Sequence, residues 1–265
     1  MLGLKIFLHA VRMVLGNLGA AIRISLPILA VWPAASAYEF IKFGSIAGLN
    51  EWAAGIEASG SLAAPAGFWP VIIVFMVFGI IAFLWTATAW HRFILLEEYP
   101  GAMGARFNAG AVGRYFAAGL LVTFIVILIA IALGFIAGFL GAILTRAGVN
   151  RTLVVAIITI VLYVPLLIIA YRLSLILPSS ALGPRIAIGE AWSATANASG
   201  TVLILAIVSV AVSALLNWLT AMLLVAAPVA GFVLQLIVQW GLVMVGVSIL
   251  TTIYGLFIQK RSLNA

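Results

Sequence analysis

Six apolar runs dominate this chain, and each is long enough to cross a lipid bilayer. The runs cover residues 24–43, 68–90, 115–144, 152–172, 201–226 and 229–258. A bilayer core takes about 20 helical residues to cross, and runs of this length do not fit the core of a soluble domain. The sequence therefore predicts an all-α, polytopic membrane bundle of six transmembrane helices, with residues 1–265 forming a single integral membrane domain.

The composition supports lipid as the solvent of this chain. Apolar residues make up 66% of it and charged residues 7%, whereas soluble domains contain roughly 45–50% and about 25%. There is no cysteine, which excludes disulfides, thiol nucleophiles and thiolate metal sites. The net charge of +7 does not indicate nucleic acid binding, because the basic residues lie mostly beside the apolar runs.

The basic residues are divided unequally between the two sides of the predicted spans. With the N-terminus inside, ten of the thirteen Lys and Arg fall on the inner side. These are Lys5, Arg12, Arg23, Arg92, Arg106, Arg114, Arg172, Arg185, Lys260 and Arg261. The three on the outer side are Lys42, Arg146 and Arg151. Basic residues concentrate on the cytoplasmic side of membrane proteins, so both termini are predicted to be cytoplasmic.

Residues 4–18, before the first run, have the pattern of a cationic amphipathic helix. The apolar residues at helical spacing are Leu4, Phe7, Leu8, Val11 and Leu15. The residues on the opposite face are Lys5, His9 and Arg12. Such a helix lies in the membrane interface, here on the inner leaflet. It serves either as a topology anchor or to recognise anionic lipid or an acidic partner.

A weak internal similarity favours three related helical hairpins. A shift of 180 positions aligns Lys5 with Arg185 and Asn17 with Asn197. Each hairpin would begin with a short amphipathic helix on the inner face and end with a basic residue at the inner interface. Internal repeats are common in membrane folds, and chance similarity of a few positions is the competing interpretation.

Two arginines at the ends of apolar runs are the main candidates for binding lipid phosphate. Arg92 and Arg172 are each followed by further apolar residues, so their guanidinium groups are expected to extend to the headgroup level. A guanidinium there binds phosphate through two parallel hydrogen bonds. The other lipid-phosphate candidates are His91, Lys5 and Arg12. The alternative role for the arginines is topological anchoring.

Few polar residues lie within the predicted spans. Asn217, Gln235 and Gln239 are expected to form an intramembrane polar cluster, because a tight turn around Pro228 brings them to a similar depth. Such amides either hold helices together by hydrogen bonds or line a route for a substrate. Near the outer end of the first run, Glu39 and Lys42 lie three residues apart and are expected to pair.

The segment 172–197 contains a recognisable pattern. Arg172 is followed by Pro178, and Glu190-Ala191-Trp192 is followed by Thr195 and Asn197. This pattern resembles that of bacterial six-helix inner-membrane proteins of poorly defined function, which include the membrane domain attached to some glycerophosphodiester phosphodiesterases. The resemblance implies a bacterial inner (cytoplasmic) membrane and a helical bundle. The phosphodiesterase activity is not expected here, because it belongs to a soluble catalytic domain.

The inventory of reactive residues does not favour an enzyme. His9 and His91 show no metal-ligand spacing with the carboxylates, so we expect no metal site and no cofactor. The predicted function is non-catalytic binding or organisation of anionic phospholipid at the inner leaflet, with membrane phospholipids as partners and no nucleic acid. The alternatives are an accessory subunit or assembly factor, with other membrane protein subunits as partners, and a small-solute transporter.

Overall fold

The structure, a computed structural model, describes residues 1–44, 48, 51–52, 54–56, 60, 63–183 and 185–263. Across these residues it is built from α-helices and contains no strand. The helices are α1 (Leu2–Gly16), α2 (Leu18–Ile24), α3 (Leu26–Phe43), α5 (Phe68–Leu96), α6 (Ala109–Arg146), α7 (Arg151–Leu173), α8 (Ile176–Leu182), α9 (Ile188–Ala194), α10 (Ser199–Ala226) and α11 (Pro228–Phe257).

Five helical segments of the described chain are long and apolar enough to cross a membrane. They are Phe68–Leu96, Ala109–Arg146, Arg151–Leu182, Ser199–Ala226 and Pro228–Phe257, and the number rises to six if α1 and α2, bent by 82° at their junction, count as one. These segments indicate an all-α, multi-pass membrane protein. In lipid the backbone must satisfy its own hydrogen bonds, which is why each run is helical.

The run at 24–43 is the one that differs most from its expected form. It becomes α3, which starts at Leu26 after a break at Ser25 and is 18 residues long. Glu39, Lys42 and two prolines reduce its apolar character, and α3 is not among the five segments above. Pro27 occupies the first turn, where a missing N–H has no cost. Pro33 alone lies inside the helix.

Several helices extend beyond the apolar runs that predict them. The run at 115–144 becomes α6, which begins at Ala109 because the Asn108 side chain accepts a hydrogen bond from the Ala111 N–H. The run at 152–172 begins at Arg151, where the Asn150 side chain caps α7. Helix ends are set by such caps as well as by the thickness of the bilayer core.

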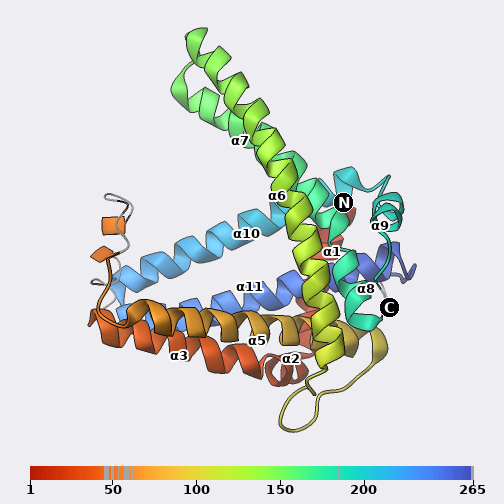
Figure 1. The fold of residues 1–265 in the computed structure, drawn as a ribbon. Coiled ribbons are helices and arrows are strands. Elements are labelled where there is room, and N and C mark those ends of the chain that lie inside the picture. The colour runs from red at the N-terminus through yellow and green to blue at the C-terminus, as the bar shows by residue number, and fades with distance from the viewer. Residues whose placement is uncertain are drawn as a thin grey trace.

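Consecutive long helices pair into hairpins (Figure 1). α3 packs along α5, α6 along α7, and α10 along α11. The α6–α7 hairpin diverges from the other long helices, so that its turn lies away from α10. α1 packs on both α10 and α11. This arrangement contains the three expected hairpins, although α9 is only 7 residues long and does not match α1 in length.

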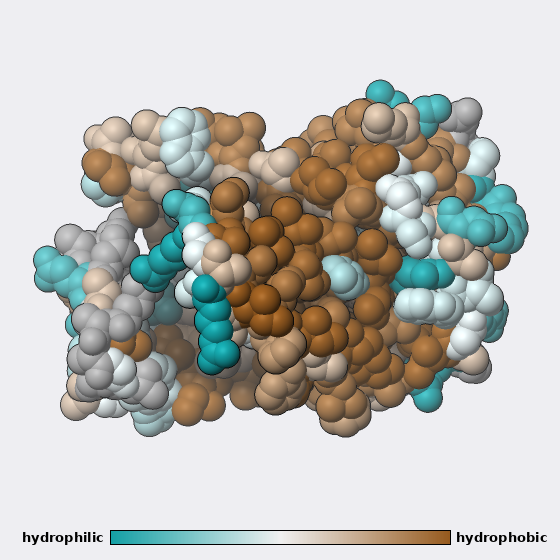
Figure 2. Space-filling view, turned by 90° about the horizontal axis from the view of Figure 1, so that it is seen from above, coloured by the Kyte–Doolittle hydropathy of each residue, from teal (hydrophilic) through white to brown (hydrophobic). Residues whose placement is uncertain are grey.

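The two ends of the bundle differ in charge. The N-terminus, the C-terminus, α8 and α9 lie together at one end (Figure 1). We call it the basic end, because it holds ten Lys and Arg that precede the first hairpin, lie in or beside the connections between hairpins, or follow α11. Lys42, near the end of α3, and Arg146 and Arg151, at the turn of the α6–α7 hairpin, lie at the far tips of their hairpins, which we call together the opposite end (Figure 1). Figure 2 shows a broad hydrophobic band between hydrophilic residues at the two ends, as expected for a bundle that spans a membrane.

The packed core lies toward the basic end. In α6 the residues buried in the first half include Tyr115 and Ala118, and beyond Val122 the only ones are Ala137 and Gly141. In α11 most of the buried residues lie between Met244 and Gly255. One core cluster joins residues of α1, α6, α10 and α11 with the segment around α8. The remaining halves of the helices expose many of their large apolar side chains.

The face of α1 that packs against the protein differs from the expected apolar stripe. Its buried residues are Gly3, Ile6, Phe7, Ala10 and Val14, while Leu4, Leu8 and Leu15 are exposed. The small residues explain the difference, because a Cβ atom at Gly3 would lie 2.5 Å from the Thr201 carbonyl oxygen of α10. α1 thus docks through small residues and turns its exposed leucines outward, beside the exposed Lys5 and Arg12.

Candidate functional site

His91 lies at the centre of a buried polar network between α5, α6 and α11. Its side chain is 0% exposed. Nδ1 lies 2.8 Å from the Thr251 hydroxyl and Nε2 lies 3.3 Å from the Tyr115 hydroxyl. The Thr251 hydroxyl donates its proton to the Val247 carbonyl, so it accepts from the His91 Nδ1–H. Nε2 then accepts from Tyr115. Both ring nitrogens are occupied within the protein.

Arg172 does not present its guanidinium group to the surface. The residue is 7% exposed, and Nε donates to the Thr195 hydroxyl at 3.0 Å. A terminal nitrogen donates to the Trp192 carbonyl at 3.0 Å, and the guanidinium carbon lies 3.9 Å from the centroid of the Trp192 ring. Three residues of the 172–197 pattern therefore form one contact, which fastens α9 to the end of α7.

Arg92 is held by two partners at the basic end. Its Nε and one terminal nitrogen donate to the two carboxylate oxygens of Glu98, and the other terminal nitrogen donates to the Ala181 carbonyl at 2.9 Å. Arg92 and Glu98 thus form an ion pair across the end of α5. The residue also connects the end of α5 to α8.

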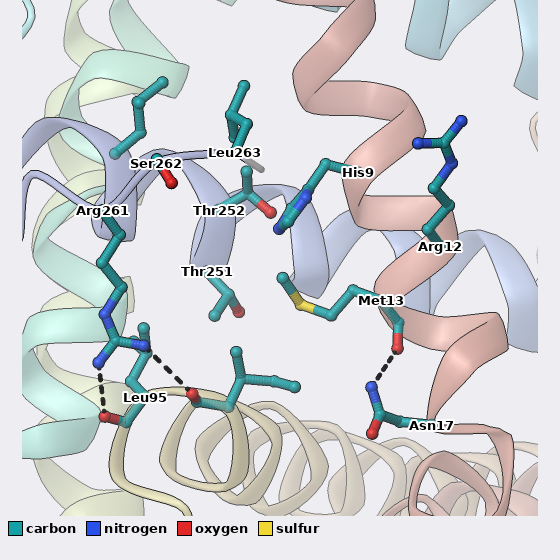
Figure 3. A pocket seen from close by; sticks show the side chains of 13 residues that line it. His9, Arg12, Met13, Asn17, Leu95, Thr251, Thr252, Arg261, Ser262 and Leu263 are labelled. Carbon is teal, nitrogen blue, oxygen red and sulfur yellow. Dashed lines mark hydrogen bonds between the residues drawn. The ribbon is translucent and has the colours of Figure 1, made fainter. Parts of the chain in front are cut away.

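Arg12 borders a pocket of about 750 Å³ at the basic end, where α1 meets the ends of α5 and α11. Figure 3 shows His9 pointing into this pocket, with Arg12 and Arg261 on opposite sides of it. We call it the Arg12 pocket. The other polar residues that line it are Asn17, Thr251, Thr252 and Ser262, and the apolar ones include Met13, Ile94, Leu95, Leu256 and Leu263.

A backbone turn after α11 places Arg261. Lys260 has a positive φ of 57°, and the Arg261 N–H donates to the Gly255 carbonyl at 2.9 Å. This turn sends the Arg261 side chain back to the end of α5, where it donates to the Ile94 and Leu95 carbonyls at 3.5 and 3.1 Å. These carbonyls belong to the last turn of a helix and lack intrahelical partners, so Arg261 both caps α5 and forms one wall of the pocket.

The electrostatics of the Arg12 pocket suit an anion that carries an apolar group. Two arginines and one histidine line it, and none of its lining residues is acidic. Guanidinium groups bind phosphate well. The leucines and isoleucine beside them would accept the apolar part of the same molecule. Lys5, exposed on the same helix, does not line the pocket.

The expected polar cluster between α10 and α11 is only partly formed. The Gln239 side-chain amide donates to the Asn217 side-chain oxygen at 2.7 Å, and Asn217 donates to the Ser213 carbonyl. Gln235 is half-buried, and its side chain makes no hydrogen bond to the part of the chain that the structure describes. A single hydrogen bond between the Asn217 and Gln239 side chains thus joins α10 to α11.

The expected ion pair between Glu39 and Lys42 is wrong. Lys42 instead donates to the Ala66 carbonyl at 3.2 Å and lies 5.7 Å from the Tyr38 ring centroid. The Glu39 side chain borders an apolar pocket between α3 and α5. The chain returns beside the end of α3 at Ala66, so the Ala66 carbonyl, and not the Glu39 carboxylate, accepts the hydrogen bond from the Lys42 ammonium group.

Sequence reasoning missed the roles of Arg261 and the hydroxyl residues near it. Arg261 reads as a topology signal, because nothing in the sequence shows that the chain turns back after α11. Thr251 and Thr252 lie in an apolar run and give no signal of their own. No protein-family model, curated protein or solved structure matches this chain. The assignment of a function therefore depends on the site itself.

Proposed function

We propose that this protein binds anionic phospholipid, without catalysis, in the Arg12 pocket. Arg12 contacts the phosphate group, and Arg261 contacts it through the N–H groups that it does not use on the Ile94 and Leu95 carbonyls. His9 and the Ser262 hydroxyl donate to the remaining oxygens, and the apolar residues of the pocket accept the glycerol and upper acyl chain. The observation that carries the proposal is a pocket lined by three basic side chains and no acidic one, at the basic end of an apolar bundle.

The position of α1 supports a lipid as the ligand. Its exposed surface combines Leu4, Leu8 and Leu15 with Lys5 and Arg12. A helix with such a surface binds the interface of a membrane that contains anionic lipid. The leucines would enter the acyl region while the basic side chains remain among the headgroups, so the pocket would open at headgroup depth.

The membrane and the orientation are part of the same proposal. Basic residues gather on the cytoplasmic side, so the basic end faces the cytoplasm, both termini included. The proposal takes α3, and not the bent pair α1 and α2, as the sixth span, and the packing of α3 along α5 from the basic end toward the opposite end (Figure 1) supports this choice. The pattern at 172–197 favours a bacterial inner membrane.

His91, Arg92 and Arg172 take a supporting role in this proposal. His91 is hydrogen-bonded to Thr251 and Tyr115. Arg92 is bonded to Glu98, and Arg172 is bonded to Thr195 and Trp192. A headgroup would have to displace those partners before it could bind. Arg12 has no such competitor, since its side chain makes no hydrogen bond to the described residues.

Native mass spectrometry tests the proposal directly. We expect protein released from its membrane in mild detergent to retain phosphatidylglycerol in preference to phosphatidylethanolamine. Arg12→Gln should weaken retention about tenfold, the effect of losing one hydrogen bond to a charged group. Arg146→Gln removes the same charge at the opposite end and should change nothing.

Two results would contradict lipid binding in the Arg12 pocket. One is unchanged retention of phosphatidylglycerol in the His9→Asn/Arg12→Gln double variant. The other is a protein partner retained at fixed stoichiometry in place of lipid, which would make the chain an accessory subunit of a larger complex.

A further inference from the structure

A second pocket, also of about 750 Å³, lies beside a different face of α5. It is enclosed by α5, the loop from Glu97 to Asn108 and the first turn of α6. We call it the Thr88 pocket. Its polar lining residues are Trp85, Thr88, Arg92, Glu98, Tyr99, Arg106 and Asn108. None of these residues lines the Arg12 pocket, which meets α5 at Ile94 and Leu95.

Two of these residues have buried polar atoms without a hydrogen-bond partner. Trp85 Nε1 and Thr88 Oγ1 are both buried and unpaired within the described chain, and Thr88 is only 1% exposed. Their neighbours on α5 are satisfied, because Thr86 donates to the Ile24 carbonyl and Trp90 donates to Ser248 Oγ. An unpaired buried donor costs about 1–3 kcal/mol, so two of them beside one pocket indicate that a ligand supplies the missing acceptor.

The free groups around the Thr88 pocket are hydrogen-bond donors. Glu98 is the one acidic lining residue, and its carboxylate is neutralised by Arg92. Arg106 is exposed, and its side chain has no partner among the described residues. The first turn of α6 borders the same pocket at Ala109, only its Ala111 N–H is taken by the Asn108 side chain, and the N-terminus of a helix attracts anions. The pocket therefore suits a ligand that is negatively charged and rich in acceptor oxygens.

We propose that the Thr88 pocket binds a phosphoryl group. Trp85 and Thr88 donate to its oxygens from α5, Arg106 supplies the countercharge, and the first turn of α6 binds the remaining oxygen. The phosphodiester of a lipid headgroup and the phosphate of a soluble ester present the same oxygens.

The loop beside the pocket has a membrane-interface character. Tyr99 and Met103 are 77% and 97% exposed, and the half-exposed Phe107 packs its ring edge on Trp85 with centroids 5.2 Å apart. A lipid headgroup and a soluble phosphate ester can both reach a pocket at this depth, so the experiment must separate the two sources.

The test uses a variant that removes both unpaired groups and little else. Trp85→Phe keeps the ring against Phe107, and Thr88→Val keeps the side-chain shape. Ser209→Ala is the matched control, because Ser209 Oγ is another buried, unpaired hydroxyl and it does not line this pocket. Without ligand, all of these variants should fold at least as stably as the parent protein, since each removes an unsatisfied group.

Binding is measured in detergent by titration with short-chain phosphatidylglycerol and, separately, with glycerol phosphate. All proteins carry Arg12→Gln, so that the Arg12 pocket contributes least. We expect the Ser209→Ala protein to bind like its parent, and the Trp85→Phe/Thr88→Val protein to bind about tenfold more weakly or worse. Binding of the lipid alone identifies a headgroup, and binding of both ligands shows that the phosphoryl group suffices.

The inference would be overturned if neither ligand binds. It would also be overturned if the Trp85→Phe/Thr88→Val protein binds with the same affinity as its parent. The outcome is independent of the proposed function. If Arg12→Gln alone leaves lipid retention unchanged while the Thr88-pocket variant reduces it, the proposed function fails and the Thr88 pocket remains.

Discussion

The basic end and the opposite end of the bundle are held together by different means. At the basic end, buried polar side chains join the helices, as Trp90 joins Ser248 at 2.8 Å and Arg172 joins Thr195 at 3.0 Å. At the opposite end, Gly134 and Gly138 have nothing within 4 Å of the space a Cβ would fill, and the close approaches at Gly141 and Gly231 join only the two helices of one hairpin, at Ile158 and Leu224. Lipid is as apolar as the helices, so burial alone does not hold them together. Specific contacts therefore determine which ends are packed, and here most of them lie at one end.

A glycine at each end tests this comparison most strongly. Gly3→Leu should destabilise the protein by about 3 kcal/mol, because its side chain meets the backbone of α10, which cannot move aside. Gly138→Leu lies in open space and should be neutral or slightly stabilising, since leucine favours helix more than glycine does. Unfolding in detergent measures the stability of both variants. Equal losses of stability would contradict the conclusion that one end is tightly packed and the other is open.

Two arginines at the two ends of α7 give a second test. Arg172→Met removes two hydrogen bonds and the contact with Trp192 and should cost about 2 kcal/mol. Arg151→Met at the start of α7 removes an exposed side chain and should leave stability within about 0.5 kcal/mol. Tryptophan fluorescence would also report the loss of the contact at Trp192. No difference between the two variants would show that the buried arginine adds nothing.

The smallest effect is expected within the one polar contact between α10 and α11 outside the basic end. Gln239→Leu removes its hydrogen bond to Asn217 and should cost about 0.6 kcal/mol, the average for such bonds within membranes. Gln235→Leu, on the same helix without a bond to break, is the control. A loss above about 2 kcal/mol for Gln239→Leu would mean that the opposite end is held as firmly as the basic end.

The sequence predicts most of the long helices and one of the side-chain contacts between them. Apolar runs give the helices because lipid forces each backbone to bond to itself. Asn217 and Gln239 could be paired because the turn at Pro228 fixes their relative depth. That contact joins neighbouring helices, so a short connection determines it.

Contacts between distant segments could not be predicted. The orientation of α1 depends on the close fit of Gly3 against Thr201. A prediction from hydrophobic residues places leucine, and not glycine, on the buried face, so it could not find this orientation. The burial of Arg172 depends on Trp192, which arrives after α8 and a loop. The ligand proposed for the Thr88 pocket depends on two side chains that lack a hydrogen-bond partner, Trp85 and Thr88, and no sequence pattern reveals a missing hydrogen bond.

The bend of 82° between α1 and α2 has a consequence for biosynthesis. It lays α1 across α10 and α11, which leave the ribosome after α3 to α9, whereas α1 leaves it before them. α1 must therefore wait without its partners until α10 and α11 have been inserted. A chain truncated before α10 would expose the Ile6 and Ala10 face of α1 to quality control.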